Sequence, residues 1–252
     1  MLTTKLKRLR LGYAAGVVEA HHQQALKEKL GYLEFLERLI DDELHSRDDK
    51  GLQKRLRAAH FPVVKTLEEF DFAFQPKLDA MLVKSLASCE FIAKHENVLL
   101  IGPPGVGKSH LGTALAVKAC MRGYSVLFTT IQHLASRLSA ALADLSVDKV
   151  IKPLVDADLV MLDELGFTPL GKTVADYIFR IVSERYERGS IIVTSNKSFE
   201  AWGEMFADPI LATAVLDRLV HHAHIVPIIG ASYRTREQKT KAGSPPKMAK
   251  SA

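Results

Sequence analysis

The fold is decided by Val98-Leu-Leu-Ile-Gly-Pro-Pro-Gly-Val-Gly-Lys-Ser109, an apolar run that enters a glycine-rich loop. Residues 98–101 are continuously apolar and are stopped by Gly-Pro-Pro, which predicts a short buried strand. Residues 111–122 carry apolar side chains at helical spacing and predict a helix. The loop between them satisfies the phosphate-binding pattern G-x-x-x-x-G-K-[ST] in the strand–loop–helix context that this pattern requires.

This loop has the chemistry of a phosphate cradle. Glycines let backbone N–H groups wrap a phosphate, and the helix N-terminus adds partial positive charge. We expect Lys108 to reach the outer phosphates and the Ser109 hydroxyl to hold Mg²⁺. A chance glycine-rich turn is the alternative, which the flanking strand and helix disfavour. The predicted nucleotide contacts are Gly102, Pro103, Pro104, Gly105, Val106, Gly107, Lys108, Ser109 and His110.

A pair of acids, Asp163 and Glu164, ends a second apolar run downstream of the loop. The carboxyl ends of parallel strands face the ligand crevice, so we expect Asp163 to lie near Mg²⁺ and to act through its water shell. Glu164 can then orient or deprotonate the attacking water. Acids often end strands, and this interpretation depends on the complete phosphate loop that precedes them.

Three later polar residues are further candidates. Asn196 follows the strand predicted over residues 190–194, where it can hold water or touch the γ-phosphate; a turn residue or helix cap is the alternative. Arg218 lies near the end of the helix predicted over residues 209–220. It is either an ordinary surface charge or a contact to a neighbouring subunit's γ-phosphate. Arg234, after the last strand, is a second candidate phosphate contact.

Composition suits one large domain with a smaller one. The 252 residues are 47% apolar and 25% charged, as in ordinary globular proteins. The sequence predicts neither a secretory signal nor a membrane span. Two cysteines without metal-ligand spacing favour a reduced, cytoplasmic setting. His221, His222 and His224 lack a companion Cys or acid at ligand spacing, so we expect a partly buried, hydrogen-bonded cluster rather than a metal site.

Charge is distributed unevenly along the chain. Residues 1–65 carry 13 Lys/Arg against 9 Asp/Glu, and residues 231–252 carry 6 against 1. The stretch between them carries 15 against 19. Basic ends around a near-neutral middle suggest a polyanionic partner, although ordinary solvated lysines explain the pattern equally well.

Three segments are expected along the chain: a small all-α domain over residues 1–64, an α/β domain over residues 65–236 and a disordered basic tail over residues 237–252. In the first we expect three short helices, the last beginning near Asp48 or Asp49 as N-cap. Other predicted helices cover residues 78–90, 111–122, 131–145, 174–188 (ended by Gly189) and 209–220, and predicted strands cover residues 98–101, 125–129, 159–164, 190–194 and 224–229.

The segment of residues 65–76 is interpreted as a linker into the α/β domain. Phe70, Phe72 and Phe74 alternate along it, as in an extended segment laid on a surface. Part of this linker is expected to line the adenine pocket. Simple hydrophobic docking of the linker is an equally good explanation.

Together these motifs resemble the AAA+ ATPases and, among them, the IstB branch of transposition helpers, which is close to the DnaC helicase loaders. The resemblance extends to about residue 236. It rests on the phrases Gly102-Pro-Pro-Gly-Val-Gly-Lys-Ser-His-Leu111, Val160-Met-Leu-Asp-Glu-Leu-Gly166, Thr194-Ser-Asn196, Leu216-Asp-Arg-Leu219 and Ser232-Tyr-Arg234. It implies a three-layer AAA+ P-loop domain with a central parallel sheet, preceded by the small helical domain.

The resemblance also implies roles for single residues. Lys108 and Ser109 take the Walker A roles, and Asp163 and Glu164 the Walker B roles. Asn196 takes the place of sensor 1. Arg218 corresponds to the arginine finger and Arg234 to sensor 2.

The implied function is Mg²⁺-dependent ATP hydrolysis coupled to assembly of several copies on duplex DNA. The resemblance implies DNA deformation, stimulation of hydrolysis by DNA, and recruitment or stimulation of a partner transposase. A replicative helicase loader is one alternative. A scaffold that binds ATP and hardly hydrolyses it is another, and Glu164 argues against it because a scaffold needs no water-activating carboxylate.

Overall fold

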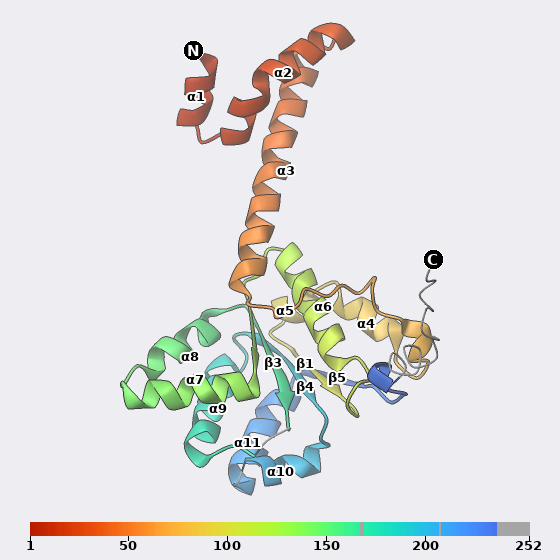
Figure 1. Ribbon diagram of the computed structural model, residues 1–252, viewed down its shortest axis with the longest axis vertical. Helices are drawn as coiled ribbons and strands as arrows, with labels where there is room; N and C mark the ends of the chain where they lie inside the picture. Colours follow the sequence, from red (N-terminus) through yellow and green to blue (C-terminus); the bar gives the residue numbers. More distant parts are fainter. Residues whose placement is uncertain (167–168, 207, 236–252) are drawn as a thin grey trace, which may run out of the picture. The chain divides into compact units, whose positions relative to one another are not determined.

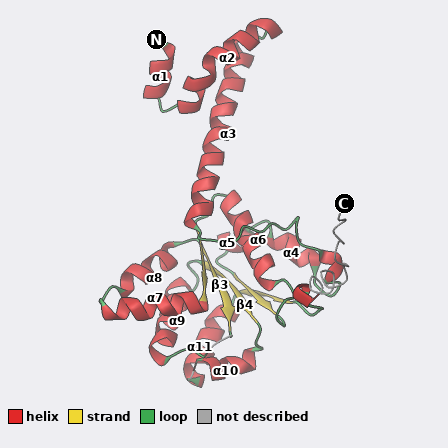
Figure 2. Cartoon of the chain, in the orientation of Figure 1, coloured by secondary structure: helices red, strands yellow, loops and turns green. Residues whose placement is uncertain are grey.

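The computed structural model describes residues 1–166, 169–206 and 208–235, and the predicted basic tail over residues 237–252 lies outside them. Contacts divide the chain into two compact units, with the division between Lys54 and Arg55. This division lies upstream of the boundary expected at residue 64. Figure 1 traces the elements of both units, and Figure 2 separates helices from strands by colour.

The first unit is helical, as the sequence predicts. Its helices are α1 (Leu2–Arg8), α2 (Gly12–Glu28) and the start of α3 (Tyr32–Ala58). The core is small: the buried apolar cluster consists of Ala14, Val18 and Leu39, with Leu6, Leu11, Val17 and Phe35 packed against it. A unit of this size buries little apolar surface and gains little stability from it.

The expected start of a helix near Asp48 or Asp49 is wrong. Both aspartates lie inside α3, which runs unbroken from Tyr32 to Ala58. The chain breaks earlier, at Lys29, whose left-handed conformation (φ 56°) ends α2. The leucine pattern hides this break because it continues at helical spacing on both sides of it.

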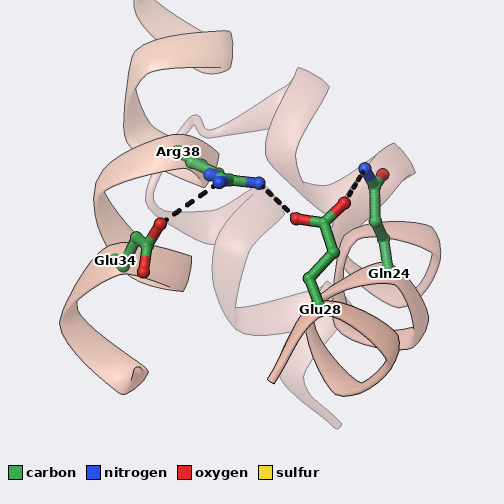
Figure 3. Close-up of polar contacts among 4 residues, drawn as sticks. All are labelled: Gln24, Glu28, Glu34 and Arg38. Atoms are coloured by element: carbon green, nitrogen blue, oxygen red, sulfur yellow. Dashed lines mark hydrogen bonds and ion pairs between the residues drawn. The ribbon is translucent and has the colours of Figure 1, made fainter. Parts of the chain in front are cut away.

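Polar contacts fasten α2 to α3 within the first unit. Arg38 bridges the two helices, with Nη1 2.8 Å from Glu28 on α2 and Nη2 3.1 Å from Glu34 on α3 (Figure 3). The buried Glu43 carboxylate accepts the Ala14 backbone N–H at 2.9 Å. This bond, aided by Arg47, holds the pKa of Glu43 below its usual range.

The second unit contains a five-stranded parallel sheet, which confirms the predicted fold class. Its strands are β1 (Asn97–Ile101), β2 (Val126–Thr130), β3 (Leu159–Leu165), β4 (Ser190–Ser195) and β5 (Ala223–Pro227). Their order is β2-β3-β4-β1-β5. Strands β3, β4 and β1 are therefore neighbours, so the residues that follow their carboxyl ends meet at one edge of the sheet.

Helices cover both faces of this sheet (Figures 1 and 2). They are α4 (Ala80–Leu86), α5 (Glu90–Ala93), α6 (Lys108–Met121), α7 (Ile131–Ala143), α8 (Val147–Asp156), α9 (Lys172–Arg185), α10 (Trp202–Met205) and α11 (Pro209–Val220), with 3-10 turns η1 (Phe72–Phe74) and η2 (Phe199–Ala201). No helix in the described ranges is long and apolar enough to cross a membrane.

Alternation along the strands produces the layers. Leu100 and Met161 contact α6, where Gly112 leaves room for them. Their strand neighbours, such as Leu99 and Val160, belong to the large buried cluster that α7, α8, α9 and α11 complete on the opposite face. Side chains of successive strand residues point to opposite faces, so the continuous apolar runs in the sequence correspond to strands buried on both sides.

Two predicted helices of the second unit need correction. The helix expected over residues 78–90 is split into α4 and α5 by a turn at Cys89 (φ 63°), which α5 follows directly. The helix expected over residues 174–188 ends at Arg185. Gly189 does not end it; instead, Gly189 makes room for the Arg185 guanidinium, which a Cβ at that position would meet at 2.6 Å.

Arg185 connects three elements of the second unit. The side chain is 1% exposed and donates to backbone carbonyls only. Its acceptors are the carbonyls of Leu154, Val155, Ala157, Asp158 and Ser190, at 2.6 to 3.1 Å. Burial lowers the pKa of this guanidinium to about 10. Helix α8, which the sequence analysis did not predict, is thereby joined to the starts of β3 and β4.

The segment that enters the second unit lies along α6. It is not fully extended, because Phe72–Phe74 forms the turn η1. Four contacts attach it: Arg55 Nε to the Cys120 carbonyl at 2.7 Å, the Phe128 N–H to the Ala59 carbonyl at 2.8 Å, Lys118 to Glu68 at 2.7 Å, and His110 to the Thr66 carbonyl at 2.8 Å. We call residues 55–75 the strap.

Candidate active site

The glycine-rich loop joins β1 to the start of α6, as predicted, and its glycines are required there (Figure 1). Gly107 has φ 102°, a conformation that other residues rarely adopt. A Cβ at Gly102 would lie 2.1 Å from the Ile228 carbonyl oxygen. The Tyr233 N–H donates to the Gly105 carbonyl at 2.9 Å, so the segment after β5 holds the loop from outside.

Lys108 is buried at the centre of the loop. Its Nζ donates to the carbonyls of Gly102 and Pro103, both at 2.7 Å. Burial lowers the pKa of Lys108 and the nearby Arg234 lowers it further, whereas the charge of Asp163 opposes this shift. The Lys108 ammonium therefore contacts the carbonyls of its own loop, and its side chain lines the cavity where a phosphate would bind.

A hydroxyl–carboxylate network lies at the end of β3. Ser109 Oγ donates to Asp163 Oδ1 at 2.8 Å, and Thr194 Oγ1 donates to the same oxygen at 2.5 Å. Thr194 Oγ1 also accepts the Glu164 N–H at 3.0 Å. The predicted Mg²⁺ ligands Ser109 and Asp163 are thus in contact, and hydroxyl and carboxylate oxygens are the ligands that Mg²⁺ prefers.

The backbone of β3 is irregular where it carries the two acids. Its pairing with β4 shifts between Leu162 and Leu165. Glu164 has φ 64°, uncommon for a residue with a side chain. Because of this shift, the Glu164 N–H does not pair with the backbone of β4. It donates instead to the side-chain hydroxyl of Thr194.

These residues surround a cavity of about 610 Å³, a size that suits a nucleotide. The lining residues are Lys65, Glu69, Phe70, Asp71, Pro104, Gly105, Gly107, Lys108, Ser109, His110, Glu164, Thr194, Asn196, Tyr233 and Arg234. Of the predicted nucleotide contacts, Gly102, Pro103 and Val106 do not line it. Gly102 and Pro103 instead hold the Lys108 ammonium, and Val106 is buried.

Aromatic rings form one wall of this cavity. The Phe70 ring packs against Phe72 at 4.9 Å, His110 at 5.4 Å and Tyr233 at 6.3 Å between centroids. Phe74 packs on Tyr233 at 4.3 Å. The linker does line the cavity, through Phe70, and it is also docked by hydrophobic contact. Hydrophobic docking of the linker is therefore observed, whereas a contact of the linker with adenine stays a prediction.

Glu164 and Asn196 line the cavity from the ends of β3 and β4. The amide oxygen of Asn196 is buried without a hydrogen-bond partner among the described residues. An unpaired buried acceptor is costly unless a ligand or water satisfies it. This orphan atom fits a site that takes a polar ligand.

The two predicted arginines lie in different places. Arg234 lines the cavity. Arg218 does not: its guanidinium lies 4.9 Å above the Phe179 ring and donates to the Ala214 carbonyl at 3.0 Å. It borders a separate shallow hollow on α11 that is also lined by Pro209 and Ile210.

The profile of one protein family, described as IstB-like ATP binding protein, matches residues 4–242. The chain belongs to this family. Its relatives include the "Insertion sequence IS21 putative ATP-binding protein" of Pseudomonas aeruginosa, 45% identical over 96% of this chain and 91% of the relative. The "Insertion sequence IS5376 putative ATP-binding protein" of Geobacillus stearothermophilus is 38% identical over 92% of each chain.

Solved structures agree with the fold of this IstB-like chain. DnaI superposes with a TM-score of 0.57 and 22% identity over 65% of this chain and 90% of that one. AMPPCP-bound DnaA from Aquifex aeolicus gives 0.56 and 22% over 65% and 50%. The DnaC helicase loader gives 0.50 and 18% over 59% and 86%. These similarities confirm the three-layer AAA+ P-loop fold.

The histidines of this IstB-like protein form a hydrogen-bonded cluster, but His221 and His222 are exposed rather than partly buried. His221 Nδ1 lies 2.6 Å from the Tyr186 hydroxyl, and His222 lies 3.3 Å from Glu187. Glu187 is the companion acid that ligand spacing in the sequence did not reveal. His224 pairs instead with Glu96 at 2.7 Å.

Outside the strap, two residues of the IstB-like site were not singled out from the sequence. Thr194 contacts both acids of β3, and Tyr233 closes the aromatic wall. The sequence does place the Thr194 hydroxyl two residues before Asn196, at the end of the same predicted strand. Its contact with Asp163 and Glu164 could be predicted only from the sheet order, which places β4 beside β3.

Proposed function

We propose that this IstB-like protein is an Mg²⁺-dependent ATPase that assembles on duplex DNA and recruits or stimulates a partner transposase. The observation that supports hydrolysis, beyond ATP binding, is the contact network under the loop. There, Ser109, Asp163, Thr194 and the Glu164 backbone are joined by three hydrogen bonds. Such a network holds the proposed metal-binding oxygens of Ser109 and Asp163 together and fixes the backbone at Glu164, whose side chain lines the cavity.

In the proposed reaction, Lys108 and the loop N–H groups bind the phosphates of ATP. Glu164 accepts a proton from the attacking water, whose oxygen bonds to the γ-phosphorus as the bond to the bridging oxygen breaks. The products are ADP and phosphate. Mg²⁺, held by Ser109 and Asp163, would neutralise charge on the phosphates. Asn196 and Arg234, both in the cavity, are proposed to contact the water or the γ-phosphate.

The proposed partners follow from the relatives' names and from charge. Two relatives are named as insertion-sequence ATP-binding proteins, which places them with transposable elements. The basic start of the chain, with 13 Lys/Arg against 9 Asp/Glu over residues 1–65, suits a polyanion. We keep the expected division into a front domain over residues 1–64 and an ATPase domain over residues 65–236 as part of the proposal.

A helicase loader is the second candidate, favoured by the shared fold of DnaI and DnaC. The two candidates differ in the protein they bind. Capture of a hexameric replicative helicase by the purified chain supports the loader, whereas capture of a transposase supports the transposition helper.

Two substitutions test the site. Lys108→Ala is expected to lose ATP affinity, because it removes the buried cation. Glu164→Gln is expected to keep ATP affinity and lose turnover, because only the proton acceptor changes. The measurements are nucleotide binding by fluorescence and phosphate release, with and without duplex DNA, which is expected to raise turnover.

Glu204→Gln is the matched control, an exposed glutamate on α10 outside the cavity, and it should leave both properties unchanged. Unchanged ATP affinity in Lys108→Ala refutes the site. Unchanged turnover in Glu164→Gln, with assembly preserved, favours the ATP-binding scaffold.

A further inference from the structure

An apolar stripe on α3 lies uncovered in the first unit. Leu33, Leu36, Ile40 and Leu44 recur at helical spacing and therefore share one face of the helix. Their exposed fractions are 82%, 48%, 45% and 51%. These four leucine and isoleucine side chains form what we call the α3 stripe. A contiguous exposed apolar face of this kind marks an interaction surface more often than scattered exposed leucines do.

The first unit does not use the stripe for its own core. The face of α3 that packs on α1 and α2 is a different one, built around Leu39 and Phe35. Arg38 fastens α3 to α2 through Glu28 (Figure 3). The internal core of the first unit is small, so this unit buries little apolar surface by itself. A partner that covered the stripe would add a second buried apolar contact.

Acidic residues border the stripe along one side. Glu37 follows Leu33 by one helical turn, Asp41 follows Glu37, and Asp48 follows Leu44 in the same way. None of these three acids has an ion pair or hydrogen-bond partner for its side chain within the described residues. Over residues 34–49 there are seven acids against two arginines, a net charge of −5. The remainder of the unit, in contrast, is basic.

We propose that the α3 stripe docks an amphipathic helix of a partner protein whose apolar face is bordered by lysines and arginines. The stripe supplies the buried contact, as in other helix-in-groove complexes, and the acidic border selects a basic rim. The acidic border repels DNA. It also disfavours antiparallel pairing of two copies of α3, because that pairing would bring two acidic borders together.

The test uses the full chain and a labelled 14-residue helical peptide of leucine and lysine with the apolar residues at helical spacing. Fluorescence anisotropy at moderate salt is expected to show binding. The same peptide with glutamate in place of lysine should not bind. Glu37→Lys combined with Asp41→Lys is expected to weaken binding by roughly tenfold or more, because attraction becomes repulsion.

Asp49→Lys is the matched control, an exposed acid on the opposite side of the same helix, and it should change affinity little. Ile40→Ser, at a half-exposed position, tests the apolar part and is also expected to weaken binding. Equal effects of Asp49→Lys and the double substitution overturn the proposal. The proposal is also overturned if the parent chain self-associates and Ile40→Ser abolishes that self-association. The same holds if the glutamate peptide binds as tightly as the lysine peptide. The outcome does not depend on ATP hydrolysis.

Discussion

A single hydroxyl, that of Thr194, controls the geometry of both acids in the candidate site. Its proton goes to the Asp163 carboxylate and its lone pair accepts the Glu164 backbone N–H, so one side chain holds the proposed metal-binding carboxylate and the backbone that carries the proposed water-activating one. We predict that Thr194→Val, nearly isosteric but unable to make either bond, lowers ATP turnover by roughly 10- to 100-fold. The stimulation of nucleotide binding by Mg²⁺ should fall in parallel.

Thr194→Ser keeps the hydroxyl and is expected to restore most of the turnover. The fitted parameters separate positioning from general damage. A positioning role lowers kcat while KM for ATP changes little, and the midpoint of thermal unfolding stays close to that of the parent. Full turnover in Thr194→Val would show that the acids hold their places without it.

At the scale of elements, the second unit depends on one buried arginine. Arg185 joins α8, β3 and β4 by donating to five backbone carbonyls. Arg185→Met keeps much of the volume but leaves these buried acceptors unpaired. We predict a loss of unfolding free energy on the order of 3 kcal/mol, measured by urea denaturation. Arg188→Met, three residues on and exposed, should shift it by less than about 0.5 kcal/mol. Equal losses of unfolding free energy in the two variants would contradict a stabilising role specific to Arg185.

At the scale of the whole molecule, Arg218 requires a neighbour if it acts on ATP, because it does not line the cavity of its own chain. Arg218→Ala is expected to lower turnover by about 10³-fold or more. Mixing it with Lys108→Ala should restore turnover above the sum of the two variants. An intact arginine from the Lys108→Ala subunit then faces a site that can bind ATP.

Mixing Lys108→Ala with Glu164→Gln is the control. Both lesions lie in the same site, so no intact site forms and turnover should stay low. Recovery in the control, or no recovery in the first mixture, contradicts a site shared between subunits.

Much of the α/β unit was predictable because its strands are continuous apolar runs and its phosphate loop is a local pattern. The same holds for the contact of Ser109 with Asp163, which follows once the two strand ends meet at one edge of the sheet. What could not be predicted depends on tertiary contacts. The buried contacts of Arg185 and the role of Thr194 both depend on residues that are far away in the sequence.

The strap has a practical consequence for anyone shortening this chain. A fragment that begins at residue 65 discards Ala59, which is fully buried and bonded to the edge strand β2, and Phe61, which packs on Phe128. It also discards the Arg55 bond that ends α6. The fragment would expose apolar side chains next to the edge of β2, whose Phe128 N–H would lose its acceptor. Exposed strand edges of this kind promote aggregation. An isolated α/β unit should therefore start at residue 55.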